Sequence, residues 1–238
     1  MVNGCHRQAG RDRALTALAR WSSQYLNYSF DNPSLLRQAL SHRSVGDVNN
    51  ERLEFLGDGF LNLAIAQRLY ELCPQYSEGD LSRLRASLVN GASLKAVAIS
   101  IQLDQHIIIS NAERSSGGAR RASIIANAVE AIIGAVLLDG GYEAARQVVD
   151  HLYLDRLNNL PSPDDLKDAK TRLQEWLQAR GVDLPEYTIE HVAGADHAQT
   201  FTVSCSAEGQ ATRADGRSRR TAEQRAARLL LDILRHDE

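Results

Sequence analysis

The sequence has few of the residues that build disulfide frameworks and zinc sites. Its 238 residues include three cysteines, Cys5, Cys73 and Cys205, which lie far apart and have no metal-ligand spacing. An odd number of scattered thiols is typical of a reducing compartment, because a disulfide framework requires paired cysteines. We therefore expect a cytoplasmic protein in which the cysteines act as small apolar residues.

Long apolar runs and a large excess of positive charge are also missing. No run has the length of a membrane span, and the N-terminal MVNGCHRQAGRDR lacks the apolar core of a signal peptide. The net charge of −3 argues against a protein that coats nucleic acid along its whole surface, although it permits a local basic patch. We therefore expect no membrane partner, and an anionic partner would bind such a patch.

Two different patterns divide the chain. Apolar residues recur at helical spacing from about residue 11 to residue 158, and the segment NNLPSPDDLKDAK then interrupts this period with prolines and clustered charge. A helical pattern, three alternating patterns and a final helical pattern follow. We predict a mainly α domain over residues 10–158, a linker over 159–166, and a small α+β domain of order α-β-β-β-α over 167–236.

Three carboxylates fall on one side of a predicted helix that starts at about Asn50. Glu51, Glu54 and Asp58 stand at i, i+3 and i+7 in NNERLEFLGDGFLNLAIAQRLYE, so at about 100° per residue they share a face. Apolar residues crowd the same segment, so part of this acidic stripe must lie beside the core. Such an arrangement is costly unless a cation or a hydrogen-bond donor compensates the charge.

The alternative to a bound cation is that these acids only stabilise the helix. Glu51 would cap the N-terminus of the helix, where the helix dipole stabilises an acid. Glu54 would pair with an arginine such as Arg52, Arg83 or Arg85. Asp58 is harder to explain in this way, because it is a poor helix former placed between Gly57 and Gly59, which weaken the helix further. We expect something to approach the backbone closely there.

A second polar pair interrupts an apolar helical segment, SIIANAVEAIIGA. Asn127 and Glu130 stand at i and i+3 and share a face. If this helix packs against the first one, four oxygen-bearing side chains can converge, which suits Mg²⁺ or Mn²⁺. Zinc is disfavoured because histidine and cysteine are missing from the cluster. The sequence thus favours a divalent-metal site over a solvated acidic face, which is the alternative.

Arginines gather at the start of the last predicted helix. Arg217, Arg219 and Arg220 join the backbone NH groups of that helix terminus, and together these groups attract phosphate. The alternative is a solvated cationic face. Because arginines at a helix N-terminus oppose its dipole, their position favours a bound anion over solvation.

These motifs resemble a known family. NNERLEFLGDGFLNLAIA is similar to the signature of bacterial ribonuclease III, commonly written NERLEFLGDS, and the resemblance continues through SEGDLSRLRASLVNGASL, SSGGARRASIIANAVEAIIGAVLLDGG, DAKTRLQEWLQARG, GADHAQTFTVSC and SRRTAEQRAA. It extends from about Leu26 to Leu234. The resemblance implies a helical endonuclease domain that forms a homodimer, followed by a double-stranded-RNA-binding domain.

The resemblance also implies roles for individual residues. In that family, acids matching Glu54, Asp58 and Glu130 bind the Mg²⁺ ions that activate water and stabilise the leaving 3′ oxygen, so Asp58 and Glu130 are the expected catalytic residues. Asn127 completes the expected metal site. The remaining matches are expected to contact RNA: Glu51, Glu78, Gln174, Glu175, His197, Ser218, Arg219 and Arg220.

Two positions depart from the family pattern. Asn127 stands where the family usually has an aspartate. An amide oxygen can still ligate Mg²⁺, but it removes one negative charge from the metal site and weakens ion binding. Gly59 stands where serine is common, and we expect little consequence from this change.

The resemblance therefore implies a double-strand-specific endoribonuclease that leaves 5′-phosphate and 3′-hydroxyl ends with short 3′ overhangs, and we expect it to process ribosomal and other structured RNA precursors. The alternative is a duplex-RNA-binding protein whose nuclease centre is impaired by Asn127.

Overall fold

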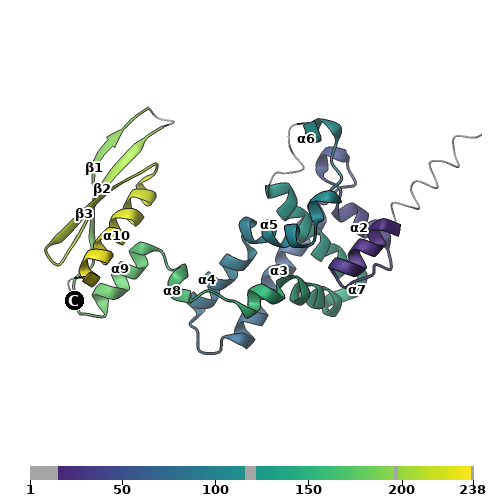
Figure 1. Cartoon of the computed structure of the whole chain (residues 1–238), viewed down its shortest axis with the longest axis horizontal. Helices are drawn as coiled ribbons and strands as arrows, with labels where there is room; N and C mark the ends of the chain where they lie inside the picture. The colour runs from purple at the N-terminus through teal and green to yellow at the C-terminus, as the bar shows by residue number, and fades with distance from the viewer. Residues whose placement is uncertain (1–15, 116–121, 196–197, 237–238) are drawn as a thin grey trace, which may run out of the picture. The chain divides into compact units, whose positions relative to one another are not determined.

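The structure is a computed structural model that describes residues 16–115, 122–195 and 198–236, so Cys5 and His197 lie outside the described residues. The chain divides into two compact units between Pro161 and Ser162 (Figure 1). Each unit is built on its own core and is described separately.

The N-terminal unit is helical, as predicted. A first helix spans residues 16–25. The following helices are α2 (Pro33–Ala39), η1 (Arg43–Val45), α3 (Glu51–Leu72), α4 (Glu78–Val89), α5 (Gly91–Ser100), η2 (Leu103–Gln105), α6 (Asn111–Ser115) and α7 (Ala122–Asn158).

Local sequence explains where several of these helices begin. The side chain of Asn32 accepts a hydrogen bond from the Ser34 amide at the start of α2, and Pro33 occupies the first turn. Ser77 and Asp80 form a reciprocal capping box at the start of α4. These caps satisfy amides that have no partner inside the helix, so they fix the helix starts.

Two glycines allow α3 and α7 to pack backbone against backbone. A Cβ atom on Gly57 would overlap the carbonyl oxygen of Glu130 on α7, and one on Gly134 would overlap the carbonyl oxygen of Leu53 on α3. The close approach predicted around Asp58 is therefore confirmed at Gly57, and the neighbour is helix α7. A Cβ on Gly59 would meet nothing within 4 Å.

Helix α7 is the main core helix of this unit. Within Ser123–Asn158, an 18-residue window has a mean hydropathy of 1.6, so the helix is long and apolar enough to cross a membrane, and 61% of that window is buried inside the protein. The prediction that no run has the length of a membrane span is therefore wrong for this helix. Its burial against α3 and α5 is that of the central helix of a globular core. Gly141, with φ of +77°, interrupts the helical backbone.

The C-terminal unit has the predicted order α-β-β-β-α. Its elements are α8 (Pro163–Leu166), α9 (Ala169–Gln178), β1 (Glu186–Ala193), β2 (Thr200–Ala207), β3 (Gln210–Gly216) and α10 (Arg219–His236). The strands form one antiparallel sheet in the order β1-β2-β3. The short helix α8, capped by Ser162, lies within the residues expected to form the linker.

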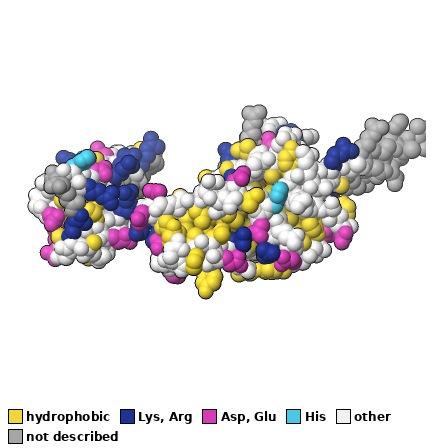
Figure 2. Space-filling view, turned by 60° about the horizontal axis from the view of Figure 1, so that its bottom comes forward, with side chains coloured by type: hydrophobic (Ala, Val, Ile, Leu, Met, Phe, Trp, Pro, Cys, Tyr) yellow, Lys and Arg dark blue, Asp and Glu magenta, His cyan; other side chains and the backbone are white. Residues whose placement is uncertain are grey.

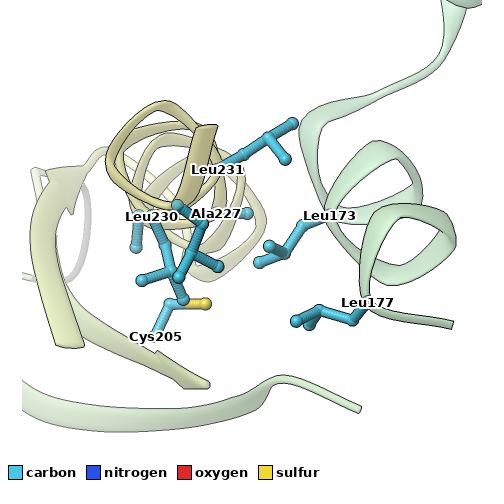
Figure 3. Close-up of a cluster of buried hydrophobic side chains, with 8 residues drawn as sticks. Leu173, Leu177, Cys205, Ala227, Leu230 and Leu231 are labelled. Atoms are coloured by element: carbon cyan, nitrogen blue, oxygen red, sulfur yellow. The ribbon is translucent and has the colours of Figure 1, made fainter. Parts of the chain in front are cut away.

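Helices α9 and α10 and the central strand β2 supply the core of the C-terminal unit. Figure 3 shows Leu173 and Leu177 of α9 pointing toward Ala227, Leu230 and Leu231 of α10. Cys205 of β2 completes this cluster, and both Cys205 and Cys73 are buried free thiols. Burial raises the pKa of each thiol. Within the described residues, the cysteines therefore act as apolar side chains, as predicted.

Candidate metal centre and nucleic-acid interface

A cleft of about 700 Å³ in the N-terminal unit contains the acidic residues singled out in the sequence. Helices α3 and α7 form one part of its wall, and the segment around η1 forms another. Its lining residues are His42, Arg43, Ser44, Asn50, Glu51, Glu54, Phe55, Asp58, Glu113, Ser123, Ile124, Asn127 and Glu130. Glu54, Asp58, Asn127 and Glu130 thus line one cleft, because α3 and α7 pack closely at Gly57.

Glu130 is the most strongly perturbed acid in the cleft. Burial, and then the charges of Asp58 and Glu54, raise its pKa to about 7. Burial removes water that would solvate a carboxylate, and like charges nearby add to this cost. The protein alone therefore does not compensate the charge of the ionised form of Glu130.

Glu54 contacts the residue that departs from the family pattern. Its pKa is raised by burial and by the charges of Glu51 and Asp58, whereas a hydrogen bond with Asn127 and the charge of Arg43 act in the opposite direction. An aspartate at position 127 would replace this hydrogen-bond donor with a further negative charge. The amide therefore lowers the repulsion among the carboxylates.

The other two acids of α3 have partners of their own. The Asp58 carboxylate accepts a hydrogen bond of 2.9 Å from the Asn62 side chain, one turn further along α3. Glu51 lies 3.5 Å from Arg43. Among the described residues, no three Asp, Glu, His or Cys side chains stand close enough to form a complete ligand set. The oxygen atoms that line the cleft therefore do not form a complete coordination shell by themselves.

The donor set nevertheless fits a hard divalent cation. Three of the carboxylates that line the cleft and the Asn127 amide come from the closely packed helices α3 and α7, and hard divalent cations prefer oxygen ligands of this kind. The raised pKa values of Glu54 and Glu130 indicate uncompensated charge that a cation would offset. The residues that could hold such an ion are Glu54, Asp58, Asn127 and Glu130.

The structural explanation fits Glu51 but not Glu54. Arg83 pairs with Asp80 at 2.7 Å, and the partner of Glu54 is Asn127. The Glu51 side chain pairs with Arg43, and its backbone amide is capped by the Asn49 side chain. Glu51 thus stands in the first turn of α3 and forms an exposed ion pair, as its structural explanation requires, whereas the hydrogen-bond partner of Glu54 is Asn127 and not one of the arginines named for it.

Glu78, also predicted to contact RNA, is not among the residues that line this cleft. It is the first residue of α4, is exposed, and accepts a hydrogen bond of 2.7 Å from Ser82. Its predicted role remains a prediction.

The η1 side of the cleft was not predicted. His42, Arg43 and Ser44 come from the segment SHRS, seven or more residues before the first acid of α3. A histidine beside an arginine is a weak signal by itself, and no helical spacing connects them to the acids. The fold alone brings them to the cleft.

The arginines at the start of α10 have different environments. Arg219 donates to Glu223 at 2.7 Å, and Lys170 of α9 contacts the other oxygen of the same carboxylate at 2.6 Å. Arg217 and Arg220 are exposed. Ser218 accepts a hydrogen bond from the Thr221 amide and so caps the helix. Figure 2 shows Lys and Arg side chains gathered on this unit, a local basic patch of the kind predicted.

The first helix of the same unit carries the other predicted contacts. Gln174 and Glu175 are exposed on α9, and Glu175 pairs with Lys167 at 2.6 Å. Their roles remain predictions, as do those of the arginines of α10.

Comparisons with known proteins agree with this architecture. Residues 32–157 match the family described as Ribonuclease-III-like, and residues 169–234 match the family described as Double-stranded RNA binding motif. The chain is 50% identical over 211 residues to Ribonuclease 3 of Alkalilimnicola ehrlichii, which covers 88% of this chain and 92% of that protein. Against Ribonuclease 3 of Nitrosococcus oceani the identity is 51% over 213 residues, covering 88% and 91%.

A solved structure is similar to the N-terminal unit. The nuclease domain of ribonuclease III from Campylobacter jejuni, described for structural flexibility in a region involved in its dimer formation, matches with a TM-score of 0.55 and 43% identity. The match covers 57% of this chain and 95% of that one. By its sequence and by the fold of both units, this chain belongs to the ribonuclease III family.

Proposed function

We propose that the protein is a metal-dependent endoribonuclease that cleaves double-stranded RNA. The observation that carries this proposal is the cleft in which the acids of α3 and α7 meet, in a chain that also contains a double-stranded-RNA-binding motif. Hydrolysis would leave 5′-phosphate and 3′-hydroxyl ends with short 3′ overhangs. Ribosomal and other structured RNA precursors in the cytoplasm are the proposed substrates.

Mg²⁺ is the proposed metal, and Mn²⁺ is a possible substitute. Glu54, Asp58 and Glu130 offer carboxylate oxygens, and Asn127 offers an amide oxygen. A divalent ion bound by these residues would supply Lewis-acid chemistry for the activation of water and the stabilisation of the leaving oxygen. The four side chains would hold the ion, and Asn127 also keeps Glu54 oriented through their hydrogen bond.

The C-terminal unit is proposed to bind the duplex without reading its sequence. Arg219, Arg220 and Ser218 lie at the start of α10 and would contact phosphates, whereas Gln174 and Glu175 of α9 would reach a minor groove. Double-stranded RNA is recognised mostly through its shape, 2′-hydroxyls and phosphates, so we expect weak sequence preference.

We also propose that the protein is a homodimer through its N-terminal domain. Helix α3 exposes Phe55, Leu63 and Tyr70, whose exposed fractions are 83%, 55% and 75%. These three residues fall within about 80° of one another at 100° per residue, on a stripe beside the acidic one. Figure 2 shows apolar side chains gathered on one face of this unit. An exposed apolar patch is typical of an interface. The Campylobacter jejuni nuclease domain, described as having a region involved in dimer formation, supports dimerisation through this domain.

The proposed function is tested by cleavage of an end-labelled RNA duplex over titrations of Mg²⁺ and Mn²⁺. Wild type is compared with Asn127→Asp and Glu130→Ala. We expect wild type to cut, Glu130→Ala to be inactive, and Asn127→Asp to need less metal because it adds a negative charge to the site. A single-stranded RNA of the same sequence serves as the control substrate.

The same experiment also tests the alternative function, a duplex-RNA-binding protein with an impaired nuclease centre. A wild-type protein that binds the duplex but does not cut it at any metal concentration, while Asn127→Asp cuts, would be a binding protein built on a nuclease fold. The hydrogen bond between Asn127 and Glu54 supports a working role for the amide.

A further inference from the structure

The wall of the cleft around η1 has no role in the function described so far. His42, Arg43 and Ser44 line the same cleft as Glu54, Asp58 and Glu130, although none of them stands in the acidic helices α3 and α7. Their chemistry differs from that of the acids, because histidine and arginine donate hydrogen bonds.

Backbone contacts hold this wall in place. The His42 amide donates to the Ile108 carbonyl at 2.9 Å, and the Ile108 amide donates to the Leu40 carbonyl at 2.8 Å. Ser41 and Ile108 form an isolated parallel β-bridge. The Asn50 amide, directly before α3, donates to the Ser41 carbonyl at 2.9 Å. The segment is therefore fixed relative to the start of the acidic helix.

Side-chain contacts fix the orientation of the His42 ring. The Ser44 amide donates to Nδ1 of His42 at 3.2 Å, so this nitrogen is an acceptor. The Ser44 hydroxyl lies 3.0 Å from the same nitrogen and accepts a hydrogen bond from the Ser110 amide at 3.1 Å. In the neutral ring the proton is therefore on Nε2, which makes Nε2 a donor in a ring that lines the cleft.

The charges of the cleft show why donors are needed there. Its described lining includes five carboxylates, from Glu51, Glu54, Asp58, Glu113 and Glu130, and in that described lining only Arg43 is an arginine or lysine. A phosphodiester that enters such a cleft is repelled unless cations and donors contact its oxygens.

Arg43 is available for such a contact. Its side chain is 71% exposed, and its distance of 3.5 Å to Glu51 is long for an ion pair. An exposed pair of this kind contributes little free energy, so a phosphate can replace the carboxylate as its partner.

We propose that His42 and Arg43 form a phosphate-contacting wall that positions the substrate strand against the carboxylates. Nε2 of His42 donates to a non-bridging phosphate oxygen, and the Arg43 guanidinium contacts the same strand. This inference rests on the proposed function, because it assigns substrate contacts within that active site.

Two substitutions of His42 separate substrate contact from local structure. In His42→Asn, the side-chain oxygen can still accept from the Ser44 amide, as asparagine does at helix N-termini, but the donor at the Nε2 position is lost. In His42→Gln, the side-chain amide can reach the Nε2 position, but the acceptor near Ser44 is lost. Thermal unfolding and the kcat/KM for duplex cleavage are measured for both.

We expect His42→Asn to keep the wild-type unfolding temperature and to lower kcat/KM about ten-fold or more, the effect of one hydrogen bond to a charged group. We expect His42→Gln to keep more activity than His42→Asn despite a lower unfolding temperature. His151→Gln on the exposed side of α7 is the matched control and should cleave like wild type.

Arg43→Ala is compared with Arg37→Ala, which removes an exposed arginine outside the cleft. We expect Arg43→Ala to lower kcat/KM and to reduce the slope of log kcat/KM against log salt by about one, as expected for one lost phosphate contact. Arg37→Ala should change neither quantity.

Wild type and Glu130→Ala are measured in the same series. If wild type does not cut, the proposed function fails, and this inference fails with it. If wild type cuts and His42→Asn and Arg43→Ala cut equally well, only the phosphate-contacting wall is refuted. In that case His42 serves solely to cap η1.

Discussion

Gly57→Ala should damage the active site through packing alone. A Cβ atom at this position would lie 2.6 Å from the carbonyl carbon of Glu130 and 2.9 Å from the amide nitrogen of Gly134, whereas ordinary contact begins at 3.4 Å. The overlap with the Glu130 carbonyl oxygen is deeper than either of these, so helices α3 and α7 must move apart by on the order of 1 Å or more. Overpacking of this kind costs about 2 kcal/mol, which lowers the unfolding temperature by about 4–8 °C in a unit of this size.

The same movement displaces Glu130 from the acids of α3. A displacement of about 1 Å in an active site can cost about 100-fold in rate, so we expect a loss of that order in duplex cleavage. The assay combines thermal unfolding with single-turnover cleavage of an end-labelled duplex.

Gly59→Ala is the matched control for this prediction. A Cβ atom at Gly59 meets nothing within 4 Å, so the substitution should stabilise α3 by up to about 1 kcal/mol through helix propensity. The reasoning would be refuted if Gly57→Ala unfolded and cleaved like wild type, or if the two variants behaved alike.

Three further predictions concern stability, assembly and binding. Burial alone would raise the pKa of Glu223, but hydrogen bonds from Lys170 and Arg219 outweigh it and lower the pKa. The resulting stability is present above the unfolded-state pKa of about 4.3 and is lost as pH falls through the lower folded-state value. In wild type, the protection of the α10 amides against hydrogen exchange, relative to their intrinsic rates, should therefore fall in this pH range. Glu223→Gln should lack this acid dependence. Leu63→Glu on α3 should convert the dimer to a folded monomer in sedimentation analysis, and a dimer that persists would argue against this face. Arg220→Ala should weaken duplex binding and reduce its salt slope by about one without changing the unfolding temperature, and an unchanged slope would remove Arg220 from the interface.

Local patterns in the sequence were sufficient for the types and order of the elements. The α-β-β-β-α order of the C-terminal unit follows from alternation and turn residues, and the start of α2 is marked by the local pair Asn32 and Pro33. Such signals act over a few residues, so they are readable without the fold. The domain boundaries proposed from the linker stay a prediction, although α8 shows that part of that segment is ordered into a helical turn.

The fold decided which predicted features matter. Gly57 and Gly59 are equivalent weak helix formers in the sequence, yet α7 packs only against the first. Asn127 was recognised as a departure from the family pattern, but its hydrogen bond with Glu54 depends on the packing of α7 on α3.

The sequence by itself determined the helical face that carries Glu51, Glu54 and Asp58, because the period of a helix is a local property. Only the tertiary structure decided that Glu130 is the acid with the strongly raised pKa, because its burial and the charges of Asp58 and Glu54 come from another helix. His42 joined the site for the same reason: contacts with Ile108, distant in the chain, place it beside acids with which it shares no sequence period.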